Sequence, residues 1–281
     1  MKITPILVNG LRKSLTPKFF IPLFIFYTLA SLAILITLIP LLDYIPSLLR
    51  LQFDERSYFI LIGPLSVILL VFLISIWFKG AVIHMFIHPS SFEDSLKKIK
   101  PLYPSLLGLS IFLYLLNSVV SSLLQTVGFG FLSLFFSVII NWFFMFSSIS
   151  IVVKKDTPEL ALIRSYNIVK KHLKETFFLL LSIGIVSSMI FLVGIFVSAY
   201  PLMKVVKHTF LNINFAEVKN FEELTISLVG TLKVSLAKKF YYVLLSLVSV
   251  SLFVSIAQVF SLAVKTEYFV KCKRKSESLN I

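Results

Sequence analysis

The stretch that decides the fold is residues 176–200, TFFLLLSIGIVSSMIFLVGIFVSAY, which contains no acidic or basic side chain. A helix needs about 20 apolar residues to cross the hydrocarbon core of a bilayer, and this stretch is long enough. Comparable stretches cover residues 19–42, 58–80, 105–127, 129–153 and 240–264. The sequence therefore predicts an all-α, polytopic membrane helix bundle of about six transmembrane helices, organised as a single integral membrane domain over residues 1–281.

Composition points the same way. Hydrophobic residues make up 58% of the 281 residues and charged residues 14%. A water-soluble domain of this size could not cover so much apolar surface with polar side chains. We therefore expect lipid to be the solvent for most of the chain.

The lysines and arginines predict an orientation. Most of the 27 fall before the first span, in the second and fourth loops, and after the last span. Because cytoplasmic loops carry the excess of positive charge, we expect both termini in the cytoplasm and the protein in the cell (plasma) membrane. The 201–239 loop is the exception, since it is predicted on the opposite side and carries six lysines.

A net charge of +14 would suggest nucleic acid as a partner of a soluble protein. Here the positive charges lie next to the membrane ends, where they attract anionic lipid headgroups by about 1 kcal/mol each. We therefore expect membrane lipids, predominantly anionic ones, as partners, and no nucleic acid. The candidate residues for anionic-lipid contact are Lys170, Lys171 and Lys174.

Each odd-numbered span is preceded by a basic, partly amphipathic segment, at residues 11–18, 92–100 and 159–174. We expect these segments to be cytoplasmic amphipathic entry helices. The second begins with two candidate capping boxes, Ser90 with Glu93 and Ser91 with Asp94. The third has Asp156 or Thr157 before Pro158 at a first-turn position.

The third entry segment carries an apolar stripe at helical spacing, formed by Leu162, Tyr166, Val169, Leu173 and Phe177. Such a helix either lies in the headgroup region and then turns, or runs straight into the fifth span. The 201–239 loop contains a similar stripe, formed by Phe215, Val218, Phe221, Leu224 and Leu228. It predicts a helix that lies on the outer membrane surface or caps the bundle.

Two asparagines form a candidate intramembrane polar pair. Asn117 and Asn141 are equally far in sequence from Phe129, the centre of the predicted turn 127–130. In an antiparallel hairpin the two amides would lie at the same depth and could hydrogen-bond across it. The alternative is a polar surface for a substrate. Small residues four apart, Gly184 with Ser188 and Gly194 with Ser198, predict close helix packing in the fifth span.

The sequence predicts neither a metal site nor a cofactor. His84 and His88 stand four residues apart and could present two imidazoles on one helix face. Zinc needs three or four ligands, and the other candidates, Glu93, Asp94 and His172, lie on other segments.

Residues 159–178 read ELALIRSYNIVKKHLKETFF. Ala161-Leu162, Arg164-Ser165-Tyr166 and Lys170 resemble the A-L-x-R-S-W/Y-x-L-x-K/R entry to the fifth span of a set of uncharacterised six-span membrane proteins. That set is similar to the membrane domain of some bacterial glycerophosphodiester phosphodiesterases. The segment TEYFVK at 266–271 is similar too, whereas Tyr166 stands where the family usually has tryptophan. The resemblance implies an architecture rather than an activity.

An enzyme is not expected. The sequence has no Ser/His/Asp, paired-carboxylate or phosphate-loop pattern, and no soluble region comparable to the ~250-residue barrel of a phosphodiesterase. We expect a non-catalytic membrane module that assembles with a protein partner or with copies of itself, or that organises anionic lipids. The alternative is a small-solute or lipid transporter or permease, although carriers usually place an ionisable group within the membrane.

Overall fold

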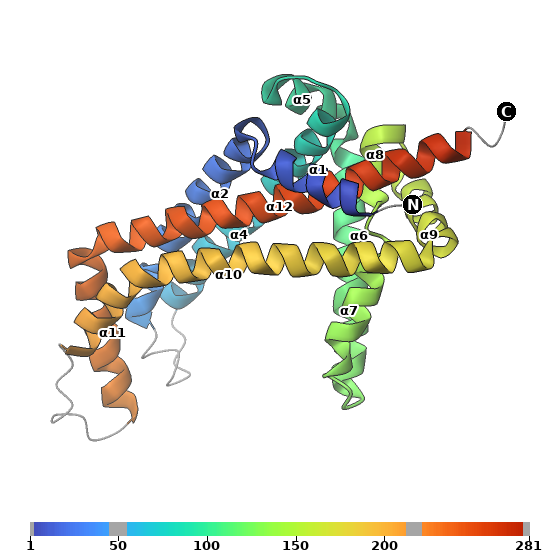
Figure 1. Cartoon of the computed structure of the whole chain (residues 1–281). Helices are drawn as coiled ribbons and strands as arrows, with labels where there is room; N and C mark the ends of the chain where they lie inside the picture. Colours follow the sequence, from blue (N-terminus) through green and yellow to red (C-terminus); the bar gives the residue numbers. More distant parts are fainter. Residues whose placement is uncertain (1–2, 45–54, 212–220, 278–281) are drawn as a thin grey trace. The chain divides into compact units, whose positions relative to one another are not determined.

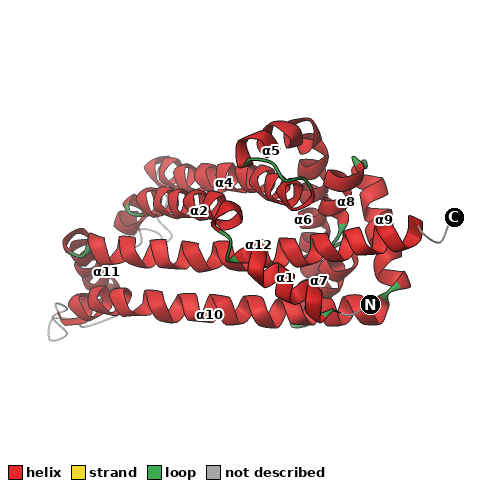
Figure 2. Cartoon of the chain, turned by 45° about the horizontal axis from the view of Figure 1, so that its top comes forward, coloured by secondary structure: helices red, strands yellow, loops and turns green. Residues whose placement is uncertain are grey.

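The computed structural model describes residues 3–44, 55–211 and 221–277, and the regular structure in these ranges is helical (Figures 1 and 2). The predicted all-α class is confirmed. Six helical segments in the described part are long and apolar enough to cross a bilayer, as expected of an integral membrane protein. They are Pro17–Leu42, Ile62–Ile87, Phe92–Thr126, Leu132–Lys154, Leu173–Leu211 and Phe240–Arg274.

The chain divides into two compact units, and four long helices contribute to both. These helices are α2 (Pro17–Leu38), α4 (Glu55–Ile87), α10 (Leu173–Leu211) and α12 (Phe240–Glu277). The first unit comprises Met1–Pro22, Leu73–Ser188 and Ile256–Ile281, and the second comprises Leu23–Phe72 and Met189–Ser255. Each is described separately below.

In the first unit, all three predicted entry segments are helical. They are α1 (Thr4–Ser14), α5 (Phe92–Ile99) and α9 (Pro158–Lys171). The first begins seven residues earlier than predicted, because Pro5 in its first turn favours a helix start there.

The helix α1 packs on α12. Ile6 is fully buried, and a Cβ atom added to Gly10 would lie 2.3 Å from Cγ2 of Val264. The side chain of Asn9 donates a hydrogen bond to Oε1 of Glu267 at 3.1 Å. Glycine therefore permits the close approach of these two helices.

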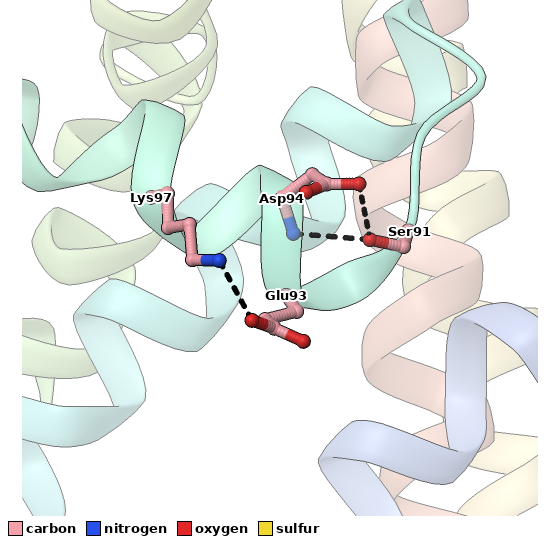
Figure 3. Close-up of polar contacts among 4 residues, drawn as sticks. All are labelled: Ser91, Glu93, Asp94 and Lys97. Carbon is pink, nitrogen blue, oxygen red and sulfur yellow. Dashed lines mark hydrogen bonds and ion pairs between the residues drawn. The ribbon is translucent and has the colours of Figure 1, made fainter.

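One of the two predicted capping boxes starts α5 (Figure 3). The N–H of Asp94 donates to Oγ of Ser91 at 3.1 Å, and this hydroxyl donates to Oδ2 of Asp94 at 2.6 Å. One turn later, Lys97 Nζ lies 2.7 Å from Oε1 of Glu93 on the exposed surface. Ser91 is thus the N-cap of α5.

The second predicted box, Ser90 with Glu93, is not formed. The Ser90 hydroxyl instead donates to the carbonyl of His88 at 3.2 Å and lies 2.8 Å from Oγ of Ser95. Ser95 in turn lies 3.2 Å from Nδ1 of His84. Ser90 precedes the cap and therefore joins the end of α4 to α5 rather than starting a helix.

The fourth span, predicted over 129–153, is present at Leu132–Lys154, but it is interrupted by a turn that the sequence did not predict. The span consists of α7 (Leu132–Phe143) and α8 (Ser147–Lys154), separated by a turn at residues 144–146. No residue of α7 is buried, whereas five of the eight residues of α8 are. Phe146, in the turn, is fully buried and stacks on Tyr268 of α12 with ring centroids 5.6 Å apart. Burial of this ring explains why the helix breaks there.

The helices α6 (Tyr103–Thr126) and α7 pack against each other as the predicted hairpin. Gly128 is in the left-handed conformation, with φ at 83°, and the N–H of Phe129 donates to the carbonyl of Leu124 at 2.7 Å. This is the geometry with which a glycine commonly ends a helix.

In the second unit, α10 extends through Pro201 to Leu211, so the fifth span does not end at residue 200 as predicted. Residues 202–211 remain mostly apolar, and proline is tolerated inside transmembrane helices. The predicted helix of the 201–239 loop is present as α11 (Phe221–Lys238). Two residues of its predicted stripe, Phe215 and Val218, lie outside the described residues.

Close packing in the second unit follows the predicted small residues. A Cβ atom added to Gly194 would lie 2.6 Å from Cβ of Phe253 in α12. Ser246 donates a hydrogen bond to the carbonyl of Ser198 at 2.8 Å. The prediction is confirmed for this pair of positions. At Gly184, in the first unit, an added Cβ would contact nothing within 4 Å.

Candidate functional site

The RSY motif organises the broken fourth span. Ser165 of α9 is fully buried, and its Oγ accepts a hydrogen bond from the N–H of Phe146 at 3.1 Å. The same hydroxyl donates to the carbonyl of Phe143 at 2.8 Å. A helix break leaves backbone groups without intrahelical partners, and a buried one is costly unless it is paired. One serine thus satisfies a donor and an acceptor at the break.

The preceding arginine is held by a buried carboxylate. Oδ2 of Asp156 accepts hydrogen bonds from Oγ of Ser150, at 2.6 Å, and from Nη1 of Arg164, at 2.6 Å. The Asp156 side chain is 7% exposed and the Arg164 side chain 38%. The carboxylate therefore ties α8 to α9 and fixes the direction of a partly exposed guanidinium.

A three-residue turn brings these groups together. Lys155 adopts the left-handed conformation, with φ at 57°, and its N–H donates to the carbonyl of Ile151 at 2.9 Å. Thr157 is extended and is the N-cap of α9, with Pro158 in the first turn as predicted. The chain therefore reverses within residues 155–157.

The end of α9 is also fixed. The helix is interrupted at His172, so α9 does not run straight into α10. Nδ1 of His172 lies 3.4 Å from Oε2 of Glu175, and the hydroxyl of Tyr268 donates to this carboxylate oxygen at 3.0 Å. The sequence left open whether this segment turns before the fifth span or runs straight into it; in the structure it turns.

A pocket of about 620 Å³ opens beside these contacts, where the end of α8, one face of α9 and the C-terminal part of α12 meet. It is lined by Lys154, Leu160, Ile163, Arg164, Asn167, Ile168, Lys171, His172, Phe269, Cys272 and Lys273.

The pocket is positively charged. Four of its lining residues are lysine or arginine, and none of the described residues that line it is acidic. Two carboxylates contact lining residues from outside the pocket: Asp156 accepts a hydrogen bond from Arg164, and Oε2 of Glu175 lies 3.4 Å from Nδ1 of His172. Leu160 and Ile163 are 52% and 57% exposed, which gives the same pocket an open apolar wall. Such a lining suits an anion that also carries hydrocarbon.

Of the three lysines predicted to contact lipid, one lines the pocket and two lie outside it. Lys171 lines the pocket. Lys170 lies outside it, with Nζ 5.8 Å from the centroid of the Tyr166 ring, and Lys174 is exposed on α10. Contact of these residues with lipid stays a prediction.

The predicted bond between Asn117 and Asn141 is not formed. The Asn117 amide donates to the carbonyl of Leu113 at 2.8 Å, and the Asn141 amide donates to that of Ser137 at 2.8 Å. No hydrogen bond joins the two amides in the described part of the chain. Polar side chains often bond the backbone one turn earlier on their own helix, and here that local partner is preferred. Oδ1 of Asn117 is buried without a hydrogen-bond partner.

His84 and His88 are close, with ring centroids 4.9 Å apart. Within the described ranges, no group of three His, Cys, Asp or Glu side chains gathers as a metal site would require. The expectation of no metal stays an expectation.

The sequence did not single out Lys154 or Lys273 as site residues; it pointed to Arg164 only through the motif at 159–178 and to Asp156 only as a helix start. One signal was available: Asp156 lies just before the N-cap of α9 and Arg164 lies in the second turn of this helix, so the two are close in sequence. The sequence near Lys273 does not indicate that this residue lies beside α9, because its position depends on how α12 packs.

Comparison with protein-family models, with curated proteins and with solved structures finds no match to this chain.

Proposed function

We propose that this integral membrane protein is a non-catalytic module that organises anionic lipids at its predicted cytoplasmic side. The observation that carries the proposal is the pocket of about 620 Å³, whose described lining residues include four cations and no acid. Four of its lining residues, Lys154, Phe269, Cys272 and Lys273, lie at the ends of the fourth and sixth spans, where headgroups meet a membrane protein. We also propose that residues 159–178 resemble part of the membrane domain of glycerophosphodiester phosphodiesterases.

Electrostatics supports an anionic partner. Lys154, Lys171 and Lys273 line the same pocket as Arg164, and each lysine or arginine near an anionic leaflet contributes about 1 kcal/mol to attraction. Lys170 and Lys174 add charge on the neighbouring surface. Anionic lipid phosphates that approach these residues reduce the repulsion among their positive charges.

The test is the lipid composition around the protein in its own membrane. The protein is extracted with its surrounding lipid in polymer nanodiscs, and the lipids are quantified by mass spectrometry. We expect anionic lipids to be enriched over the bulk membrane, and the enrichment to fall when Lys170, Lys171 and Lys174 are replaced by glutamine. No enrichment around the wild-type protein would refute the function. A stoichiometric protein in the same particles would support a partner-binding module instead.

A second candidate, a transporter or permease of small solutes or lipids, is favoured by one observation. Oδ1 of Asn117 is buried in the third span without a partner, and such polar groups often mark a pathway. The transporter predicts that Asn117→Leu with Asn141→Leu abolishes solute flux into proteoliposomes while the protein still folds. Unchanged flux, or no flux of any tested solute in the wild type, would remove this candidate.

A further inference from the structure

The pocket has two chemically distinct parts. Its cations are Lys154, Arg164, Lys171 and Lys273. Its apolar residues are Leu160, Ile163, Ile168 and Phe269. A volume of about 620 Å³ is in the range of pockets that enclose a small ligand rather than a single ion.

Arg164 is held in place before any ligand arrives. Only one hydrogen bond to Asp156 is made, through Nη1, while a guanidinium carries five N–H donors. Because Asp156 is itself buried and bonded to Ser150, the guanidinium has a fixed direction. A fixed planar fork of donors matches the oxygens of a phosphate group.

The apolar wall favours a lipid over a free anion. Leu160 and Ile163 are each more than half exposed on the face of α9 that lines the pocket. An inorganic ion would leave this wall in contact with water, whereas an acyl chain would cover it. The pocket also lies at the ends of Leu132–Lys154 and Phe240–Arg274, two of the spans.

We propose that this pocket is a specific site for one phospholipid with an anionic headgroup, whose phosphate lies against Arg164 and whose upper acyl chain lies along Leu160 and Ile163. The inference rests on the proposed function and adds to it a defined site with a stoichiometry of one. Lys154, Lys171 and Lys273 surround the headgroup.

Cys272 is the reporter for this site, since it lines the pocket and is the single cysteine of the chain. The rate at which a maleimide labels it is measured in neutral detergent, with and without dioleoyl-phosphatidylglycerol. At a lipid concentration about ten times the dissociation constant, labelling slows about tenfold, because only the empty fraction reacts. Dioleoyl-phosphatidylcholine at the same concentration leaves the rate nearly unchanged.

Matched variants separate the pocket from the surface around it. Lys154→Gln with Lys273→Gln removes two charges from the lining and raises the phosphatidylglycerol concentration that gives half-maximal protection about 30-fold. Lys170→Gln with Lys174→Gln removes two charges outside the pocket and changes that concentration less than about threefold. For each variant, protection is the labelling rate without lipid divided by the rate with lipid. This ratio cancels the effect of the charge change on the reactivity of the Cys272 thiol. If the first variant does not fold, Ile163→Glu, at an exposed wall position, tests the same site and abolishes protection.

Three results would overturn the site. Equal loss of phosphatidylglycerol protection in the two double variants would mean that the lipid is attracted by the overall surface charge and not by the pocket. Equal protection by phosphatidylcholine would mean no headgroup selection. Protection by soluble glycerol 3-phosphate at the concentration at which phosphatidylglycerol protects would mean a free-phosphate site. None of these removes anionic-lipid enrichment around the wild-type protein, so the site and the proposed function can fail separately.

Discussion

The α6–α7 hairpin and the α8–α9 junction follow each other in the chain but use their polar side chains differently. In the hairpin, Asn117 and Asn141 each donate to a carbonyl of their own helix. In the junction, Asp156 and Ser165 accept or donate bonds across three segments. In these two regions, the asparagines within the spans bond their own helices, whereas the polar residues at the junction bond other segments.

Burial follows the same division. None of α7 is buried, and the distal part of α6 is largely exposed, so this hairpin offers its surface to lipid. The junction holds fully buried side chains of Ser150, Ser165 and Phe146. We therefore place the candidate site at the junction and expect the hairpin to tolerate polar substitutions better.

The largest effect is expected from Asp156→Ala. It leaves the buried Ser150 hydroxyl and the Arg164 guanidinium without their shared acceptor, and lowers the free energy of unfolding by about 2–3 kcal/mol. Denaturation in mixed micelles, followed by tryptophan fluorescence, measures this loss. Glu93→Ala breaks the exposed pair with Lys97 and costs less than about 0.5 kcal/mol. Similar losses in both variants would show that the junction is not special.

Ser165→Ala comes next. It leaves the N–H of Phe146 without its partner at the break and lowers the free energy of unfolding by about 1–2 kcal/mol. Thr126→Ala is the control in the hairpin, because its hydroxyl is exposed and donates within its own helix. An unchanged Ser165→Ala protein would mean that the broken span does not depend on this serine.

The turn at 127–130 and the turn at 155–157 allow a direct comparison, since each contains one residue in the left-handed conformation. Gly128→Ala introduces a side chain at φ 83° and destabilises by about 1 kcal/mol. Lys155→Gly relieves the same conformation at φ 57° and stabilises by about 0.5–1 kcal/mol. Midpoints of thermal unfolding should therefore move in opposite directions. A shift of the same sign would contradict the backbone assignment at one turn.

The smallest effect is expected from the double variant Asn117→Leu with Asn141→Leu. Because each amide bonds its own helix, the free energy of unfolding changes by less than about 1 kcal/mol, and the single changes add up. Strong coupling between them in a double-mutant cycle would mean that the amides do pair across the hairpin.

Much of this architecture follows from local sequence. Apolar length predicted the spans, and basic segments predicted the entry helices, with Ser91 and Pro158 marking two starts. The break at residues 144–146 could not be predicted, because it depends on Ser165 and Tyr268, which are distant in sequence. The pocket was missed for the same reason: Lys171 alone among the proposed lysines lines it, while Lys273 arrives from the end of the last helix.

Native mass spectrometry of the protein released gently from its own membrane tests the central claim most directly. We expect one anionic phospholipid bound per chain in the wild type and in Lys170→Gln with Lys174→Gln, and its loss in Lys154→Gln with Lys273→Gln. A wild-type protein that retains only zwitterionic lipids or none, or the same anionic lipid in all three proteins, would contradict a specific site at the α8–α9–α12 junction.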